Sequence, residues 1–400
     1  MNKIYRAVIV GGGAAGLMSA VELLRGQNAL LGEDVIILER NDRVGKKLSA
    51  TGNGQGNLTN AFLSKENYHG DKSLINAFLD AEKQIHLQDY LRSIGIILCE
   101  QKDGKKYPVS RQANAVVDII RYQLEKANCE IKTNALVKDI KQKDGVYILS
   151  GEFGEIRAEN VILAVGGKAG KQFGTDGDSY HLAQKFGHEL TNLYPSLVQL
   201  KCDLKDIRGL KGLKEIAKVS AFDGDKLLKS AVGDLLFTEY GISGSSVFEI
   251  SGSLALAKSP RVNIEFLTEY SLEEVINLIK ERQRNCFIDG QDMLCGIVNK
   301  KIGQAIVKSS KSTSATDVGY RLKNFTIKVT GNLGFNYAQV TKGGIKTDKI
   351  NPLNMQSKLA KGVYLVGEMV DVDGDCGGYN LTFAFVSGIV AARDIKGLAN

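Results

Sequence analysis

The chain has 400 residues, of which 43% are hydrophobic and 24% are charged, and its formal net charge is +7. These values are ordinary for a globular protein of two or three domains. No apolar run approaches the roughly 18–20 residues that span a bilayer, and no signal peptide precedes the first apolar strand. We therefore expect a cytoplasmic protein without a membrane-spanning segment.

The chain contains six cysteines and four histidines, which limits the metal sites and redox-active disulfides that it could form. No C-x-x-C pair occurs, and the histidines have no ligand spacing, so we expect no metal and place the histidines at the surface or at helix caps. Positive charge is spread along the chain without blocks. This pattern is typical of a solvated surface rather than a nucleic-acid groove.

The first motif lies in residues 5–40. A short apolar run predicts a buried parallel strand, and it ends in a turn that fills the pattern G-x-G-x-x-G through Gly11, Gly13 and Gly16. A helix and a second strand ending in Glu39 follow. The glycines allow a tight turn, close approach of a pyrophosphate and helix–strand packing, and the acid accepts hydrogen bonds from a ribose. The segment therefore predicts a dinucleotide-binding unit.

Residues 41–60 form a polar loop that contains Lys46 and Lys47. Its Gly, Asn and Thr residues cannot form a core, but they offer donors to a phosphate or a polar ring. A flexible surface loop is the alternative. Residues 73–95 have helical spacing, and residues 130–165 predict short strands joined by polar turns. Such a meander replaces a crossover helix in FAD domains of the glutathione-reductase type.

The pattern changes in the middle of the chain. Residues 191–268 and 322–340 predict a β-rich inserted domain, and residues 269–321 between them predict a helical domain. The remaining residues, 1–190 and 341–400, form the predicted dinucleotide-binding domain. We expect the insert to cover the exposed face of a bound ring and to select the substrate.

The C-terminal segment repeats the strand–glycine–helix pattern. A strand ends at Gly367-Glu368, and Gly377-Gly378 opens the last helix. A helix N-terminus at the pyrimidine edge of a flavin stabilises the negative charge that develops on reduction, by about 0.3–2 kcal/mol in measured helix-end cases. A helix cap packed on the sheet is the alternative.

Eight segments, spread over nearly the whole length, carry a family resemblance: VGGGAAGLMSA (10–20), VGKKLSATGNGQGNLTN (44–60), KKYPVSRQANAVVD (105–118), VILAVGGKA (161–169), GTDGDSYHLAQKFGH (174–188), LLFTEYGISG (235–244), AQVTKGGIKT (338–347) and GVYLVGEMVDVDGDCGGYNLTFAFVSG (362–388). In these segments the chain resembles the HI0933-like (BaiN-type) bacterial flavoproteins, which include proteins described as aminoacetone oxidases. The resemblance implies an α/β fold with a Rossmann-like FAD-binding domain of the glutathione-reductase type. That domain is discontinuous, and the inserted β-barrel-like domain carries a small helical domain.

One loop departs from the family pattern. The family usually has G-x-G-R-C-N where this chain has GNGQGN, so Gln55 and Gly56 stand in place of Arg and Cys. Any chemistry that depends on that cysteine is therefore missing here.

The motifs and the resemblance together predict non-covalently bound FAD. Asn57 and Tyr379 are candidates for residues near the ring, and no catalytic acid or base is assigned. The predicted FAD-binding residues are Gly11, Gly12, Gly13, Ala14, Ala15, Gly16, Glu39, Arg40, Lys46, Lys47, Thr51, Gly52, Asn57, Val137, Ala164, Gly166, Gly167, Gly367, Glu368, Gly377, Gly378, Tyr379, Asn380 and Leu381.

The function that follows is an FAD-dependent oxidoreductase that transfers a hydride between the flavin and a small organic substrate. No second G-x-G-x-x-G follows a strand, so NAD(P)H would bind transiently at the flavin, and oxygen is the other candidate second substrate. An FAD-dependent tRNA-modifying enzyme and a non-catalytic flavin-binding sensor or scaffold are the alternatives. The sequence leaves the substrate and the oligomeric state open.

Overall fold

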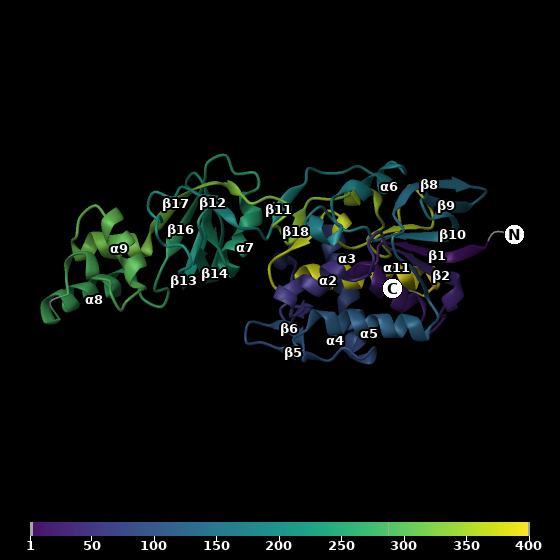
Figure 1. Ribbon diagram of the computed structural model, residues 1–400, viewed down its shortest axis with the longest axis horizontal. Helices are drawn as coiled ribbons and strands as arrows, with labels where there is room; N and C mark the ends of the chain where they lie inside the picture. Colours follow the sequence, from purple (N-terminus) through teal and green to yellow (C-terminus); the bar gives the residue numbers. More distant parts are fainter. Residues whose placement is uncertain (1–2, 287, 399–400) are drawn as a thin grey trace. The chain divides into compact units, whose positions relative to one another are not determined.

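The computed structural model describes residues 3–286 and 288–398. The chain forms two compact units, of which the first comprises Met1–Leu193 and Val340–Asn400 and the second comprises Tyr194–Gln339. Each unit has its own cluster of buried apolar side chains. Figure 1 shows the helices and strands of both units. No helix in the described part of the chain is both long enough and apolar enough to cross a membrane.

The first unit is built on a seven-stranded sheet with the strand order β7-β2-β1-β10-β9-β8, in which β19 also pairs with β10. Strands β7, β2, β1, β10 and β19 are parallel, and β8 and β9 are antiparallel additions. These strands are β1 (Ile4–Val10), β2 (Val35–Leu38), β7 (Glu130–Lys132), β8 (Val137–Lys143), β9 (Val146–Gly151), β10 (Gly154–Leu163) and β19 (Val363–Leu365).

Strand β10 joins the meander to the parallel sheet. Its first half pairs with β9, and its last residues, 161–163, pair with β19. Residues of β2 are buried along its whole length, which is why it reads as an unbroken apolar run. The predicted Rossmann-like fold with a meander is confirmed.

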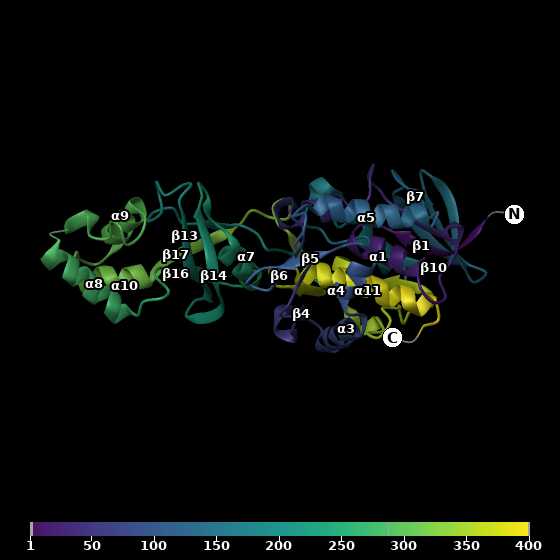
Figure 2. The same ribbon diagram turned by 90° about the horizontal axis from the view of Figure 1, so that it is seen from below.

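Helices α1 (Ala14–Leu23) and α11 (Tyr379–Ile395) lie side by side in the first unit (Figure 2). Their close approach depends on Gly388, because a Cβ there would lie 2.5 Å from the Ala15 carbonyl oxygen. The other helices of this unit are α2 (Lys46–Ala50), α3 (Lys72–Ile85), α4 (Leu87–Ser93), α5 (Ala113–Lys126) and α6 (His181–Gln184). Its short strands are β3 (Thr59–Asn60), β4 (Tyr68–Gly70), β5 (Leu98–Glu100), β6 (Lys105–Pro108), β18 (Val340–Lys342) and β20 (Val372–Gly374).

Residues 73–95, which were predicted to be helical, form two helices rather than one. His86 has a φ of 51° and separates α3 from α4. A left-handed residue cannot continue a right-handed helix, so the apolar periodicity spans two helices.

The second unit contains a closed barrel with the strand order β12-β15-β14-β13-β16-β17. One buried apolar cluster includes residues of the barrel and of the helices α8, α9 and α10. The strands of this unit are β11 (Tyr194–Ser196), β12 (Leu200–Cys202), β13 (Lys214–Asp223), β14 (Lys226–Phe237), β15 (Gly241–Ser243), β16 (Pro260–Glu265) and β17 (Phe325–Asn332). Its helices are α7 (Ser245–Ser251), α8 (Leu272–Asn285), α9 (Lys300–Ser309) and α10 (Ala315–Lys323).

Candidate functional site

The glycine-rich turn between β1 and α1 has three different steric environments. Gly11 has a φ of 105°, and a Cβ there would lie 2.4 Å from the Ala164 carbonyl oxygen. A Cβ at Gly16 would lie 2.0 Å from the carbonyl oxygen of Gly11. A Cβ at Gly13, by contrast, would meet no atom within 4 Å. The chain therefore needs Gly11 and Gly16 for its own packing, whereas Gly13 borders open space in front of the first turn of α1. That space fits a pyrophosphate.

Glu39 is buried at the end of β2 and is held rigidly against the glycine turn. Its Oε2 accepts a hydrogen bond from the Gly12 amide at 2.8 Å. Its Oε1 accepts from the Asn41 amide at 2.8 Å and from Asn41 Nδ2 at 2.7 Å. A carboxylate has about four acceptor positions, so one remains for a ribose hydroxyl. The Ala135 amide donates to the Glu39 carbonyl oxygen, so the segment that leads into the buried Val137 borders the same strand end.

Lys47 and Glu368 form an ion pair that connects loops far apart in the sequence. Lys47 Nζ lies 2.6 Å from Glu368 Oε2 and donates to the Ala169 carbonyl oxygen at 3.0 Å. Glu368 Oε1 accepts from the Thr341 amide at 2.9 Å, and Thr341 Oγ1 accepts from the amides of Lys168 and Ala169. This network fixes the turn at Gly166-Gly167. Thr341 lies within one of the family segments, but no pattern in the sequence indicates its role in this network.

The other two predicted basic residues pair with acids. Arg40 Nη1 lies 2.8 Å from Asp176 Oδ1, and Lys46 Nζ lies 2.7 Å from Asp42 Oδ1. Their roles as FAD-binding residues stay predictions.

The polar loop around Thr51 and Gly52 is tied to the first turn of α11 through Asn57. In the orientation that satisfies its hydrogen bonds, the Asn57 amide donates to the Thr59 carbonyl oxygen and accepts from the Gly378 amide, both at 3.2 Å. Asn60 Nδ2 donates to the Gly377 carbonyl oxygen at 3.0 Å. The predicted loop and the predicted start of α11 therefore lie in direct contact with each other.

Tyr379 and Asn380 stabilise the start of α11. The Tyr379 ring is buried and meets Tyr68 edge to face, with 5.9 Å between the ring centroids. The Asn380 side chain accepts from the Gly374 amide and donates to the Gly374 carbonyl oxygen, both at 2.8 Å. These contacts describe packing and loop closure. A catalytic role for Tyr379 stays a prediction.

The remaining predicted residues line the carboxyl ends of the parallel strands. Ala164, Gly166 and Gly167 follow β10, and Gly367 follows β19, where its amide donates to Ser387 Oγ at 3.0 Å. Gly11 and Glu39 occupy the equivalent positions after β1 and β2. Ligands of open α/β sheets bind at this edge.

The backbone at Gly56 does not accommodate the cysteine that the family usually has at this position. Gly56 has a φ of 76°, and a Cβ there would lie 3.1 Å from Ala113 Cα. A cysteine in this backbone would be strained and crowded. The neighbouring Arg111 has a φ of 54°, lies over the Tyr107 ring at 4.7 Å, and has a buried Nη1 without a hydrogen-bond partner among the described residues. Such a strained, unsatisfied group is typical of a ligand-facing region.

Acidic residues before α11 have unusual environments. Burial raises the pKa of Asp371 and of Asp373, although Lys342 Nζ lies 3.5 Å from Asp373 Oδ1. His69 Nε2 lies 2.9 Å from Asp375 Oδ1. His69 and Asp375 are 306 positions apart, so no local sequence pattern connects them.

The structure thus brings together two helix N-termini, a rigid carboxylate and a gap at Gly13. These groups fit a dinucleotide cofactor: amides for its phosphates, Glu39 for a ribose, and the start of α11 for the ring. Within the described residues, no group of three or more His, Cys, Asp or Glu side chains could hold a metal ion.

Relatives match the chain over its whole length. The family described as the HI0933-like protein Rossmann domain matches residues 5–394. A 3-dehydro-bile acid delta(4,6)-reductase of Clostridium scindens is 33% identical over 410 residues, which cover 98% of both chains. Two proteins named ribosomal RNA dihydrouridine synthase are similar as well. The one from Haemophilus influenzae is 28% identical over 99% of this chain and 100% of its own, and the one from Escherichia coli is 25% identical over 98% of both.

A solved structure shares the fold. The 3-ketosteroid-delta4-(5alpha)-dehydrogenase of Rhodococcus jostii RHA1 superposes with a TM-score of 0.54 at 14% identity, over 99% of this chain and 98% of that chain. The similarity concerns the fold alone. The match over residues 5–394 and the 33% identical relative show that the chain belongs to the HI0933-like family and is an FAD-dependent oxidoreductase.

Proposed function

We propose that this enzyme uses FAD to reduce a carbon–carbon double bond conjugated to a carbonyl group in a small organic molecule. NAD(P)H is the proposed source of the hydride. The chain has no second nucleotide-binding motif, so the nicotinamide would bind only transiently.

The names of the whole-length relatives carry this proposal. A delta(4,6)-reductase and a dihydrouridine synthase act on very different molecules. Both names nevertheless describe the addition of hydrogen across a carbon–carbon double bond. Because the relatives cover 98% or more of this chain, the shared reaction is supported over the whole chain rather than over one domain.

The described residues have distinct tasks in such a reaction. Bound FAD supplies a ring that accepts and donates a hydride. Amides of the first turn of α1 face the phosphates, and Glu39 accepts from a ribose hydroxyl. The N-terminus of α11 would hold the ring, because the positive end of its helix dipole favours negative charge in that position. The Lys47–Glu368 pair keeps the loops that form the site in register.

The test is anaerobic reduction of the FAD-loaded protein by NADPH or NADH, followed by addition of an acceptor. Cyclohexenone and 4-androstene-3,17-dione each carry a double bond conjugated to a carbonyl group, and cyclohexanone is the matched control without the double bond. We expect the flavin absorbance to return with the conjugated ketones alone, and mass spectrometry to detect the hydrogenated product. Reoxidation by oxygen but by no conjugated acceptor would identify an oxidase instead.

Ribosomal RNA is a second candidate substrate, because two relatives are named for it at 28% and 25% identity. The net charge of +7 is small for an RNA-binding protein of this length.

Incubation of the reduced protein with transcribed ribosomal RNA separates the two candidates. Hydrogenated uridine detected by mass spectrometry, together with binding that weakens steeply with salt, would support the RNA substrate. Unmodified RNA under conditions in which conjugated ketones are reduced would support the small molecule.

A further inference from the structure

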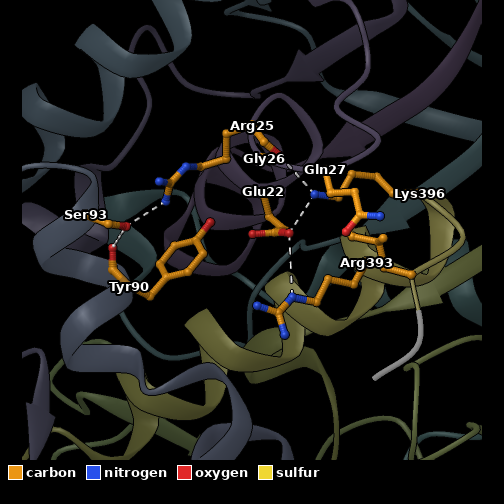
Figure 3. Close-up of a pocket in the computed structure, with 9 residues that line it drawn as sticks. Glu22, Arg25, Gly26, Gln27, Tyr90, Ser93, Arg393 and Lys396 are labelled. Carbon is orange, nitrogen blue, oxygen red and sulfur yellow. Dashed lines mark hydrogen bonds and ion pairs between the residues drawn. The ribbon is translucent and has the colours of Figure 1, made fainter.

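A pocket lies at the ends of α1 and α11 that are opposite to their cofactor-facing first turns (Figure 3). The pocket is lined by Glu22 and Arg25 at the end of α1, by Tyr90 and Ser93 of α4, and by Arg393 of α11. Glu22 is eight residues from the start of α1, which corresponds to about 12 Å along the helix. The pocket has a volume of about 530 Å³, a size typical of small-molecule sites.

The pocket has an excess of positive charge. Lys396 Nζ lies 2.7 Å from Glu22 Oε1 and donates to the Arg25 carbonyl oxygen at 3.0 Å, and both partners of this ion pair are almost fully buried. Arg393 Nε lies 3.6 Å from the same Glu22 oxygen. Arg25 Nη1 donates to Ser93 Oγ at 3.0 Å. The lining contains three cationic side chains and one carboxylate, so it carries a formal charge of +2.

Tyr90 adds a donor without an acceptor. The side chain is 9% exposed, and its hydroxyl has no hydrogen-bond partner among the described residues. The hydroxyl points toward the Glu22 side of the pocket (Figure 3), and the Arg25 guanidinium lies 5.1 Å from the ring centroid. Burial and the nearby Glu22 carboxylate raise the pKa of this phenol, so it stays a neutral donor. Helix dipoles account for cations at the ends of α1 and α11. They do not account for a buried phenol whose hydroxyl lies beside the Glu22 carboxylate yet makes no hydrogen bond of ordinary geometry among the described residues, which costs free energy.

We infer that this pocket binds the phosphate group of a small molecule. A phosphate ester carries a charge between −1.5 and −2 near neutral pH, roughly the charge of the lining with the opposite sign. The guanidinium groups of Arg25 and Arg393 suit bidentate contacts to phosphate oxygens. The volume exceeds that of a phosphate alone and leaves room for an organic part. This site is independent of the cofactor and of the proposed reaction.

Calorimetry on the FAD-loaded protein tests the inference, because the cofactor then fills its own phosphate site. Inorganic phosphate and glycerol 3-phosphate are the probes, and acetate at equal ionic strength is the control. We expect saturable binding of both phosphates and a loss of about tenfold or more in affinity in Arg393→Gln, the size of one charge-assisted contact. Arg121→Gln makes the same charge change on the exposed face of α5 and should bind phosphate as the wild type does.

Three results would overturn the inference: no saturable heat, equal affinity for acetate, or unchanged phosphate affinity in both Arg393→Gln and Arg25→Gln. The Tyr90→Phe variant gives a readout without any ligand. If the hydroxyl lacks an acceptor, the Tm of this variant is equal to or above that of the wild type. A lower Tm would show that the hydroxyl already has a partner and would remove the case for an absent ligand.

Discussion

At Gly13 the backbone leaves space that the protein does not use for its own packing. The φ of Gly13 is −84°, so a side chain there is not strained. We predict that Gly13→Val folds with a Tm close to that of the cofactor-free wild type but binds no detectable FAD, because the valine occupies the space of the pyrophosphate. Flavin absorbance of the purified protein and thermal melts measure the two effects.

Gly16→Val is the matched control. A Cβ there would lie 2.0 Å from the Gly11 carbonyl oxygen, so overpacking destabilises the fold by about 1–3 kcal/mol or more. We expect a lower Tm in this variant even without FAD. Normal flavin content in Gly13→Val would show that the phosphates bind elsewhere.

His188 makes stability depend on pH. The sequence placed it at the surface or at a helix cap, but it is 3% exposed and its Nε2 lies 2.8 Å from Ser357 Oγ. Burial lowers its pKa below the usual 6.5. The unfolded chain therefore takes up a proton near pH 6.5, whereas the folded chain does so only at lower pH. Its contribution to stability is full above pH 6.5 and is lost as the pH falls through the folded pKa.

We predict that His188→Gln removes this part of the pH dependence. Between the two pKa values the effect reaches about 1.4 kcal/mol per pH unit. Thermal melts from neutral to mildly acidic pH should show a smaller fall of Tm in the variant than in the wild type. His86→Asn, at an exposed left-handed position, is the control and should retain the wild-type slope. If Tm falls with pH at the same slope in His188→Gln and in the wild type, His188 is not the group responsible for this pH dependence.

At the scale of elements, the contact between α1 and α11 links the two halves of the cofactor site. Both helices begin at predicted cofactor turns, and Gly388 lets α11 approach α1 closely. We predict that Gly388→Val destabilises the protein by about 1–3 kcal/mol through overpacking. It should also weaken FAD binding, because the two helix starts shift relative to each other.

Denaturant titration and FAD titration measure these effects. Asn76→Val introduces the same branched side chain at an exposed position of α3. Asn and Val have similar helix propensities, so this control is expected to change neither the free energy of unfolding nor the FAD affinity appreciably. A destabilised Gly388→Val protein with wild-type FAD affinity would show that the two helix starts are positioned independently of this contact.

For the chain as a whole, the buried apolar residues described in the first unit form one cluster, and those described in the second unit form another. Every predicted FAD-binding residue also belongs to the first unit. We predict that excision of residues 194–339, with a short Gly/Ser linker, leaves a folded protein that binds FAD. Substrate reduction should be lost, because we assign substrate selection to the inserted segment.

Circular dichroism and FAD titration of the excised protein provide the test. The Gly13→Val exchange in the same shortened chain is the control, and it should abolish FAD binding. A folded shortened chain without FAD affinity would assign the inserted segment to the cofactor site and contradict our division of the chain.

Features with a local cause were predictable from the amino-acid sequence alone. The glycine turn, the acid at the end of β2 and the buried parallel strands follow from short patterns, because backbone conformation and strand burial constrain neighbouring residues directly. The Rossmann-like fold was therefore predictable. A break inside a helical pattern was not, since the apolar spacing of residues 73–95 continues through His86.

Contacts between distant side chains depend on three-dimensional packing and were not predictable from the sequence. Lys47 pairs with Glu368 across 321 positions, and Glu22 pairs with Lys396 across 374. Sequence periodicity shows that a residue is buried or lies near a strand end, but it does not show which distant residue that side chain contacts. Partners are set by how helices and strands pack, through contacts such as that of Gly388 with Ala15. For this reason the pocket at the ends of α1 and α11 leaves no signature in the sequence.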